Sequence, residues 1–380
     1  MTAPHEVVID ARWLRTGIGR YILTLLRDLK PNLPDTFLSC VTMSSHAASL
    51  APLCDRIIEM NCGIYSLGEQ LRLSLAARDA VAFCAPHYNI PVFRRGPMVV
   101  TIHDVTHLLF PAYRTALRAR LYANTMLHAA SARATRIVTP SFYTRDCLIQ
   151  HLGTDPAKIC VIPCALSEAF YPRPPAEAIE SVRRSHRIAA PYILFVGSTA
   201  PHKNLTALLK AHRLLSATHR DVPELVLVLP RITPTTQRDR EFRLLLDLPG
   251  VYRLYGVSDE SLASLYSAAV MTVVPSFEEG FGLPVIESMV CGTPVICSRT
   301  ASLPEIAGDS AIYFDPGSVE ELAAAIDLLL ASPTLQERLV EQGLHTAAQF
   351  SGTRMASTYA RVLSSVLRES AADGGARDAA

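Results

Sequence analysis

Short apolar runs alternate with longer amphipathic stretches along most of this chain. Runs such as Val7–Ile9, Met98–Ile102 and Tyr192–Val196 have the length and composition of buried strands, whereas Tyr21–Leu29 and Leu205–Leu215 have the apolar spacing of helices. Strands that alternate with helices predict parallel sheets joined by right-handed crossovers. The pattern therefore favours an α/β fold made of doubly wound sheets.

A cluster of breaker residues interrupts this pattern near the middle of the chain. The string Tyr171-Pro-Arg-Pro-Pro is followed by a charged stretch that runs to Arg187. A single hydrophobic core rarely grows beyond about 250 to 300 residues, so 380 residues favour two domains. We predict a first domain over 1–172, a linker over 173–190 and a second domain over 191–350.

The end of the chain has a different composition. Residues Ser351 to Glu369 are placed to form a last helix, and the residues from Ala371 to the end are small or charged and include a pair of glycines. We predict a helix over 351–370 and a disordered tail over 371–380.

The strongest chemical signal is one strand, loop, helix and strand unit. The apolar strand Val270–Val274 leads into the loop Glu278–Gly282, Pro284 marks the first helical turn, and Gly292 ends the helix before the strand Val295–Cys297. Glycines let backbone N–H groups approach a ligand closely, and a helix N-terminus favours an anion. This unit therefore predicts a loop that binds a diphosphate.

Two carboxylates flank the predicted diphosphate loop. Glu279 lies in the glycine loop, and Glu287 follows eight residues later, in what we predict to be the first turn of the helix. Both are suited to accept hydrogen bonds from sugar hydroxyls. In the alternative interpretation, Glu287 only interacts with the helix dipole and Glu279 is a solvated loop acid.

The string Glu-Gly-Phe-Gly-Leu-Pro from Glu279, with its second acid at Glu287, resembles the E-x7-E signature of the retaining glycosyltransferases of family 4. The resemblance implies a glycosyltransferase B fold, in which two Rossmann-like domains face each other across a cleft and the last helix crosses back to the first domain. It also implies sugar transfer from a nucleotide-diphosphate donor by front-face displacement, without an enzymic nucleophile.

The same resemblance implies roles for single residues. Glu279 would hydrogen-bond the donor sugar as a catalytic residue, and Glu287 would bind the ribose. The donor-binding loop consists of Gly280, Phe281, Gly282 and Leu283, and the N–H groups of the last three would face the diphosphate.

A second motif runs from Phe195 to Leu205. It places Gly197 at a strand end and Lys203 just before a helix, where an ammonium group can meet diphosphate oxygens. We predict Lys203 as a catalytic residue, and Gly197 and Ser198 as donor-binding residues; a solvated lysine that caps a turn is the alternative. Family members commonly have arginine where this chain has Ser198, so His202 or an arginine from elsewhere would have to replace that charge.

The segment that begins at Tyr252 matches the place where family members hold the nucleobase, near Tyr255 to Val257, so Gly256 and Val257 are predicted as donor-binding residues. The chain has no Asp-x-Asp triplet, which argues against the metal-dependent glycosyltransferase A class. We therefore expect no metal and no cofactor, with the nucleotide sugar as co-substrate. Fixed N–H groups, the helix dipole and Lys203 would take the place of the metal.

A glycine pair precedes the first predicted helix, in the string Asp10-Ala-Arg-Trp-Leu-Arg-Thr-Gly-Ile-Gly-Arg-Tyr. The third glycine of the dinucleotide fingerprint is missing, which disfavours a dehydrogenase. The Gly-Ile-Gly-Arg-Tyr part resembles the mannosyltransferase branch of family 4 that builds polysaccharides, so we predict Gly17 and Gly19 as donor-binding; a purely structural turn is the alternative. Trp13 is suited to packing or to stacking on an acceptor sugar, and we favour packing.

His103 and Asp104 follow the apolar strand Met98–Ile102, at the edge where a parallel sheet binds ligands. The resemblance gives His103 contact with the donor sugar or its phosphate, and we predict it as a catalytic residue. Asp104 fits a cap for the next turn as well as it fits a functional role.

Residues 105–145 contain six arginines and no acid. The arginines are Arg114, Arg118, Arg120, Arg133, Arg136 and Arg145. A basic amphipathic helix can lie on anionic lipid, which would suit a lipid-linked glycan acceptor, but a solvated charged face explains the same pattern.

Composition limits the remaining classes. A net charge of +1 argues against a nucleic-acid partner. Nine scattered cysteines without paired metal-ligand spacing fit reduced thiols. Because no signal peptide and no apolar run of about 18 residues are apparent, we predict a cytoplasmic protein, or one peripheral on the inner face of the plasma membrane.

The sequence thus predicts a metal-independent hexosyltransferase that moves α-mannose from GDP-mannose onto a glycan or lipid-linked glycan, in polysaccharide or lipopolysaccharide biosynthesis. Another family 4 donor remains an alternative: UDP-glucose, UDP-GlcNAc or a deoxysugar nucleotide. So do a nucleotide-sugar epimerase and a non-catalytic nucleotide-sugar-binding protein of the same fold.

Overall fold

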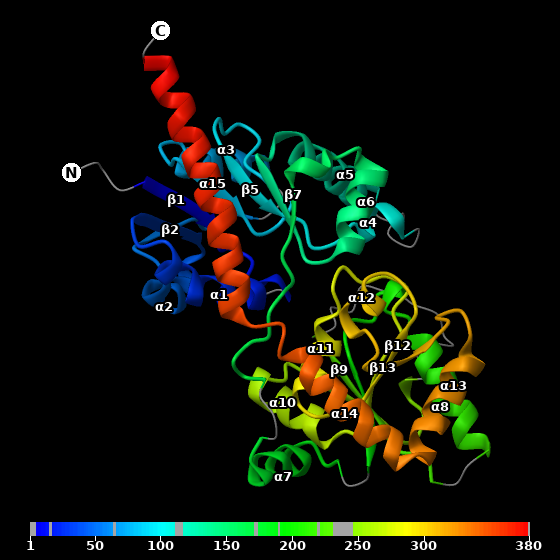
Figure 1. The fold of residues 1–380 in the computed structure, drawn as a ribbon. Helices are drawn as coiled ribbons and strands as arrows, with labels where there is room; N and C mark the ends of the chain where they lie inside the picture. The colour runs from blue at the N-terminus through cyan, green and yellow to red at the C-terminus, as the bar shows by residue number, and fades with distance from the viewer. Residues whose placement is uncertain are drawn as a thin grey trace. The chain divides into compact units, whose positions relative to one another are not determined.

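The computed structural model describes residues 5–14, 17–63, 66–110, 117–170, 174–188, 191–218, 221–230 and 246–378, of which 67, 117–120 and 373–378 are described by their backbone alone. The chain forms two compact α/β units (Figure 1). The first unit comprises Met1–Ser167 and Ser351–Ala380, and the second comprises Glu168–Phe350. The predicted fold of two doubly wound parallel sheets is confirmed.

The first unit has a seven-stranded parallel sheet within its described residues, in the order β3-β2-β1-β4-β5-β6-β7. Its strands are β1 (His5–Asp10), β2 (Thr36–Thr42), β3 (Arg56–Glu59), β4 (Ala82–Ala85), β5 (Met98–Thr101), β6 (Arg136–Thr139) and β7 (Ile159–Val161). The central strands β4 and β5 are buried along their whole length, and apart from Thr101 at the end of β5 their residues are apolar.

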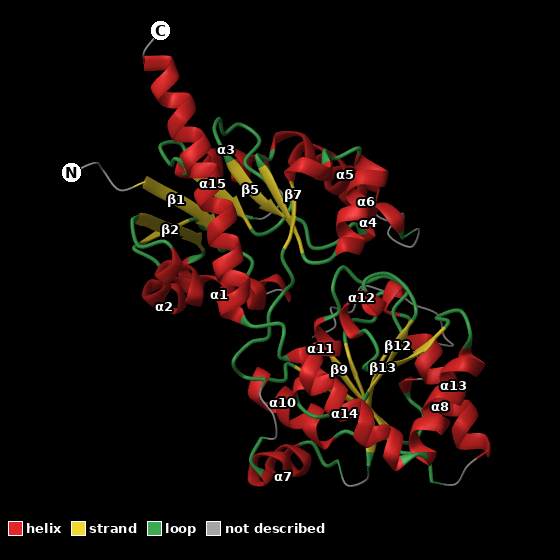
Figure 2. Ribbon diagram, viewed as in Figure 1, coloured by secondary structure: helices red, strands yellow, loops and turns green. Residues whose placement is uncertain are grey.

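Helices cover this sheet (Figure 2). They are α1 (Gly17–Leu29), α2 (Ala47–Leu50), α3 (Leu67–Ala76), α4 (Thr106–Leu109), α5 (Leu117–Arg133), α6 (Phe142–Leu152) and α15 (Gly352–Asp378). The C-terminal helix α15 lies beside α1 (Figure 1), and Thr353 Oγ1 donates to Asp28 Oδ2 at 3.1 Å. The predicted return of the last helix to the first domain is therefore observed.

The second unit repeats the architecture with a six-stranded parallel sheet within its described residues, in the order β10-β9-β8-β11-β12-β13. The strands are β8 (Tyr192–Val196), β9 (Glu224–Leu229), β10 (Val251–Tyr255), β11 (Met271–Val274), β12 (Val295–Ser298) and β13 (Ala311–Phe314). The helices are α7 (Ala176–Ser185), α8 (Leu205–Thr218), α10 (Asp259–Ala268), α11 (Leu283–Val290), α12 (Leu303–Ala307), α13 (Val319–Ala331) and α14 (Pro333–Ala347). Figure 2 shows the strands between α8 and α13 on one side and α10, α11 and α14 on the other.

The order of the strands in each sheet indicates where a ligand should bind. In both sheets the chain starts in the middle, builds to one edge, and returns to the other side of its first strand: β1 neighbours β4, and β8 neighbours β11. Ligands of doubly wound sheets bind outside the carboxyl ends of the strands at this switch point. In the second unit, the loops that leave β8 and β11 carry Lys203 and Glu279.

Two boundaries differ from the sequence prediction. The predicted linker over 173–190 contains α7, which packs on α10 in the second unit. Helix α7 begins directly after Pro175, because proline is well suited to a helix start even though it breaks a helix interior.

The predicted disordered tail is also wrong over most of its length, because α15 continues to Asp378. Each residue added to an existing helix gains one hydrogen bond without a new nucleation step, and alanine favours that extension.

Candidate functional site

Lys203 and Glu279 meet at the switch point of the second unit. Lys203 Nζ donates to Glu279 Oε1 at 2.7 Å and to Oε2 at 2.8 Å, and Ser276 Oγ also donates to Oε1 at 2.7 Å. The two charged side chains are only 22% and 10% exposed, so the ion pair is partly shielded from water. These residues are 76 positions apart, and the adjacency of β8 and β11 brings them together.

The sequence did not predict the ion pair between Lys203 and Glu279. The sequence assigned Lys203 to the diphosphate and Glu279 to the sugar, without a contact between them. In the structure, the ammonium group neutralises the carboxylate at the same strand ends. A donor that binds here would therefore meet a paired lysine, which must share its hydrogen bonds with the incoming oxygens.

The glycine loop has a geometry that requires glycine at its last position. Gly282 has φ +100° and is the N-cap of α11, and a Cβ added there would lie 2.8 Å from Leu303 Cδ2. Phe281 is 5% exposed, and its ring packs edge to face on Phe350 with centroids 5.5 Å apart. The side chain of Phe281 therefore anchors the loop in the core, while Leu283 begins the helix.

Glu287 is buried in α11 and accepts a hydrogen bond from Tyr266 OH at 2.9 Å. It is 2% exposed. The predicted position in the first helical turn is wrong: α11 begins at Leu283, which places Glu287 in the second turn. The reason is that the left-handed conformation of Gly282 ends the loop immediately before Leu283, so the helix starts early.

The remaining donor-binding candidates of this unit also lie at the carboxyl ends of strands. Gly197 follows β8, and Gly256 and Val257 follow β10. Ser198 Oγ accepts from the N–H of Ala200 at 3.3 Å, so it supports the turn where family members commonly have arginine. Because all strands of the sheet are parallel, these residues share one edge with Lys203 and Glu279.

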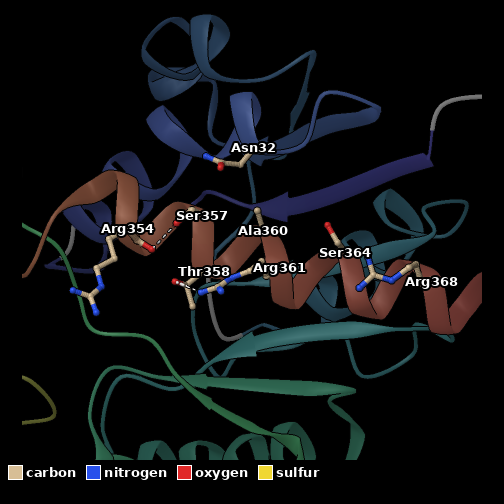
Figure 3. Close-up of a pocket in the computed structure, with 8 residues that line it drawn as sticks. All are labelled: Asn32, Arg354, Ser357, Thr358, Ala360, Arg361, Ser364 and Arg368. Atoms are coloured by element: carbon tan, nitrogen blue, oxygen red, sulfur yellow. Dashed lines mark hydrogen bonds between the residues drawn. The ribbon is translucent and has the colours of Figure 1, made fainter.

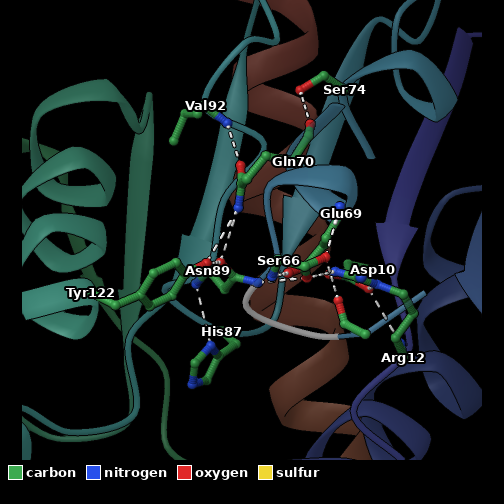
Figure 4. A network of polar contacts seen from close by, with 11 residues as sticks. Asp10, Arg12, Ser66, Glu69, Gln70, Ser74, His87, Asn89, Val92 and Tyr122 are labelled. Atoms are coloured by element: carbon green, nitrogen blue, oxygen red, sulfur yellow. Dashed lines mark hydrogen bonds and ion pairs between the residues drawn. The ribbon is translucent and has the colours of Figure 1, made fainter. Parts of the chain in front are cut away.

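The first unit has a buried network of charged side chains at the carboxyl end of β1 (Figure 4). Arg12 donates from Nε and Nη2 to the two oxygens of Asp10, both at 2.7 Å, and Nη2 also lies 2.7 Å from Glu69 Oε1. Burial alone would lower the pKa of Arg12, but these two carboxylates raise it above its ordinary value, so the guanidinium stays charged.

The network continues through α3 to the segment after β4. Ser66 and Glu69 form a capping box at the start of α3, and Glu69 Oε1 also accepts from Asn89 Nδ2 at 2.8 Å. Asn89 Oδ1 in turn accepts from Tyr122 OH at 2.5 Å and from Gln70 Nε2 at 3.2 Å. The network therefore holds the segments after β1 and β4, which flank the switch point of this unit.

Sequence reasoning missed this network. A signal was present, because Asp10 and Arg12 stand two residues apart at the end of an apolar run. Their partners could not be found in this way, because Glu69 and Asn89 come from other elements.

Aromatic and imidazole rings pack beside the network. Trp13 stacks on His87 with ring centroids 4.2 Å apart and is 5% exposed, in agreement with the packing role favoured from the sequence. Burial lowers the pKa of His87 to about 3, and the nearby His103 adds to the shift. His87 is therefore neutral at physiological pH.

His103 follows β5, as predicted, and its ring is oriented by two contacts. Nε2 lies 2.9 Å from the carbonyl oxygen of Pro86, and the ring packs edge to face on Tyr21 with centroids 4.7 Å apart. Because a carbonyl oxygen only accepts, Nε2 carries the proton. Burial lowers the pKa of His103, which favours a neutral ring with Nδ1 as an acceptor. Asp104 Oδ1 accepts from the N–H of Thr106 at 2.9 Å, so it supports the turn before α4, although the N-cap of α4 is Val105.

The two glycines after β1 have different environments at the start of α1. A Cβ on Gly19 would lie 2.3 Å from the carbonyl oxygen of Leu14, so the fold itself requires glycine there. Among the described residues, a Cβ on Gly17 would meet no atom within 4 Å. Of the two predicted donor-binding glycines, Gly19 is thus required by local packing, whereas Gly17 has no such packing requirement in the described part of the chain.

Three of the six arginines in residues 105–145 have partners in the structure. Arg133 donates to the carbonyl oxygen of Arg94 at 2.8 Å, Arg136 donates to Glu369 at 2.5 Å, and Arg145 pairs with Asp146 at 2.8 Å. The side chains of Arg114, Arg118 and Arg120 lie outside the described residues.

Three general findings apply to the described part of the chain. None of its nine cysteines forms a disulfide. It has no group of three or more His, Cys, Asp or Glu side chains that could hold a metal ion. None of its helices is long and apolar enough to cross a bilayer.

In the second unit, a glycine loop, a lysine and a buried acid of α11 lie at the switch point of a doubly wound sheet. This arrangement is typical of α/β proteins that bind nucleotide diphosphates. Residues 179–346 match the family model of glycosyl transferases group 1, and residues 72–170 match that of glycosyltransferase family 4. The chain is 32% identical to O-antigen chain mannosyltransferase B of Escherichia coli, over 88% of this chain and 92% of that protein. It belongs to glycosyltransferase family 4, and the resemblance seen in the sequence is confirmed.

Two further comparisons agree. O-antigen chain mannosyltransferase RfbU of Salmonella typhimurium is 28% identical and is matched over 69% of either chain. The solved structure of HepE from Anabaena, in complex with UDP and glucose, superposes with a TM-score of 0.76 at 18% identity, over 96% of this chain and all of the other. At this identity the superposition shows the shared glycosyltransferase B fold.

Proposed function

We propose that this glycosyltransferase transfers α-mannose from GDP-mannose onto a glycan or lipid-linked glycan acceptor during polysaccharide or lipopolysaccharide assembly. The main support for a donor site in the second unit is the Lys203–Glu279 ion pair, which lies beside the glycine loop at the switch point of the sheet. The choice of mannose and of an O-antigen type of product follows from the mannosyltransferases that the chain resembles.

In this proposal the diphosphate lies against the N–H groups of Phe281, Gly282 and Leu283, at the positive end of the α11 dipole. Lys203 stabilises the negative charge that develops on the leaving diphosphate. Glu279, once its ammonium partner turns toward the phosphate, accepts hydrogen bonds from the donor sugar. Glu287 binds the ribose, while Gly197, Ser198, Gly256 and Val257 shape the turns that hold the rest of the nucleotide.

His103 is proposed to bind a sugar hydroxyl rather than a phosphate. Its Nε2 proton is directed at the carbonyl oxygen of Pro86, so the remaining nitrogen, Nδ1, is an acceptor. An acceptor nitrogen attracts a hydroxyl proton and repels a phosphate oxygen. Gly17, where an added Cβ would contact none of the described residues, is the better candidate for close approach of phosphate or acceptor.

A donor panel tests the function. Purified protein is incubated with GDP-mannose, UDP-glucose, UDP-GlcNAc or a deoxysugar nucleotide, each with and without a lipid-linked glycan, and release of nucleoside diphosphate is followed. We expect acceptor-dependent release from GDP-mannose. Acceptor-independent conversion would favour an epimerase, and binding without turnover would favour a non-catalytic protein.

Activity is expected to survive strong chelation. Lys203, the loop N–H groups and the helix dipole can together carry the charge of the diphosphate, so no metal is needed for that purpose. The measurement is the initial rate with GDP-mannose in excess EDTA, then after addition of Mg or Mn. An activity that EDTA abolishes and either metal restores would contradict a metal-independent mechanism.

Attachment to anionic membranes through residues 105–145 is also proposed, because a lipid-linked acceptor would be presented there. Wild-type protein should float with vesicles rich in anionic lipid at low salt but not with neutral vesicles, since each surface arginine contributes up to about 1 kcal/mol that salt weakens. Changing Arg114, Arg118 and Arg120 together to Gln should abolish this flotation.

The chain offers a matched control on α15. Arg354, Arg361 and Arg368 are spaced seven residues apart and line a groove of about 670 Å³ together with Asn32 and hydroxyl side chains (Figure 3). Changing these three arginines to Gln removes the same charge from the same unit and should leave flotation unchanged. If only the α15 variant loses flotation, the membrane surface lies on α15. If neither variant loses flotation, the arginines of 105–145 are a solvated face.

A further inference from the structure

The turn that follows β12 lies against the glycine loop that follows β11. Ser302 Oγ donates to two carbonyl oxygens of that loop, those of Glu279 and Phe281, each at 2.9 Å. The backbone N–H of Ser302 also reaches the carbonyl oxygen of Glu279, at 3.4 Å. Ser302 is 0% exposed, so no water competes for these bonds. One hydroxyl hydrogen is thus shared between two acceptors in a three-centre bond.

A second hydroxyl of the same turn extends this contact. Thr300 Oγ1 lies 3.3 Å from the carbonyl oxygens of both Ser276 and Phe277. Ala301, between the two hydroxyl residues, has φ +54°, a conformation that costs free energy for a residue with a Cβ. Strain of this kind persists only where surrounding contacts impose it, and here the contacts on both sides are to the segment 276–281 between β11 and α11.

The direction of these carbonyl groups decides where the loop N–H groups point. In a trans peptide the C=O of one residue and the N–H of the next point in opposite directions, and the described residues contain no cis peptide. The carbonyl groups of Glu279 and Phe281 point at Ser302. The N–H group of Gly282 is therefore directed away from Ser302, toward the other side of the loop, and it is one of the three N–H groups proposed to face the diphosphate.

We propose that Ser302 is a positioning residue for donor binding: it holds the carbonyl groups of Glu279 and Phe281 so that the loop keeps its conformation and the N–H group of Gly282 faces the diphosphate. Ser302 acts through the loop and does not touch the donor. This inference rests on the proposed function of the glycine loop, and it adds a residue outside the E-x7-E string.

The test compares Ser302→Ala with Ser302→Thr, which keeps a hydroxyl group, and with Ser310→Ala as control. Ser310 is also buried, and its hydroxyl lies 2.8 Å from Thr346 Oγ1, away from the glycine loop. Amide hydrogen exchange of residues 276–282 is measured on the wild-type and variant proteins with and without nucleotide. Calorimetry on the same proteins measures their affinity for GDP and for UDP.

Ser302→Ala should exchange these amides about 10-fold faster and bind its preferred nucleoside diphosphate about 10-fold more weakly, the scale for losing one buried hydrogen bond. Ser302→Thr should recover most of the affinity, and Ser310→Ala should match the wild type in both measurements. Wild-type exchange and affinity in folded Ser302→Ala would overturn the proposal, as would an equal loss in Ser310→Ala. If Ser302→Ala does not fold, Thr300→Val replaces it with an expected change of about 3-fold, and no change would again overturn the proposal.

These outcomes separate the two claims. A wild-type protein that binds neither GDP nor UDP refutes the proposed donor site, and the role of Ser302 with it. Normal nucleotide binding by the wild type together with unchanged exchange in the variant refutes only the role of Ser302.

Discussion

Lys203→Ala is expected to lower turnover by roughly 100-fold or more while the protein remains folded, the scale for losing one electrostatic stabiliser of a developing anion. The structure adds a second reason for a large effect. Lys203 Nζ lies 2.7 and 2.8 Å from the oxygens of Glu279, so its loss leaves that carboxylate unneutralised beside the proposed diphosphate position. The measurement is kcat and KM with GDP-mannose, with circular dichroism to establish folding.

Two further variants make this result specific. Lys30 is ion-paired with Asp55 at another place in the chain, so Lys30→Ala removes a paired lysine and should leave turnover unchanged. Adding Glu279→Gln to Lys203→Ala removes the unneutralised charge and should recover nucleotide affinity without recovering turnover. Wild-type turnover in folded Lys203→Ala would show that the Lys203–Glu279 pair is a structural ion pair.

Glu287→Ala is expected to weaken nucleoside diphosphate binding by about 1 to 3 kcal/mol, because it removes acceptors from ribose hydroxyl groups in a buried site. Glu287 is 2% exposed, so water cannot readily replace its carboxylate. Glu279→Ala should instead reduce turnover more than nucleotide affinity. Calorimetry with GDP on the two variants, together with kcat for each, measures this division between the two acids.

Tyr266 provides the control for a structural effect. Its hydroxyl donates to Glu287 Oε2 at 2.9 Å, so Glu287→Ala also leaves that hydroxyl without its acceptor. Tyr266→Phe removes the same hydrogen bond and keeps the acid, and it should change nucleotide affinity much less than Glu287→Ala does. An equal loss in both variants, or unchanged affinity without Glu287, would refute the ribose role.

The donor-site loop could be predicted from the sequence because its geometry is set locally. Gly282 adopts φ +100° and Pro284 lies in the first turn of α11, which are the conformations that glycine and proline favour at these positions. The strand before the loop is completely buried and therefore reads as an apolar run. Local rules of this kind were sufficient for the fold class and for the position of the glycine loop.

The ends of helices were predicted less well, because they depend on packing as much as on local preference. The breaker cluster before Ala176 suggested a linker, but α7 follows it and packs on α10. Glu287 was expected in the first turn of its helix, but it lies in the second turn and accepts a hydrogen bond from a tyrosine of α10.

By itself, the sequence determined the alternating α/β architecture, the diphosphate loop and the family, because periodicity and the spacing of glycine, proline and acid residues act over a few neighbouring positions. Only the tertiary structure decided which of these residues are partners. Lys203 meets Glu279 because β8 lies between β9 and β11, so that a strand three places later in the chain is its neighbour. Arg12 meets Glu69 for the same physical reason, because β1 lies beside β4: the order of strands in a doubly wound sheet differs from their order in the chain. Ser302 reaches the glycine loop because β11 and β12, which precede the two segments, pair in the sheet.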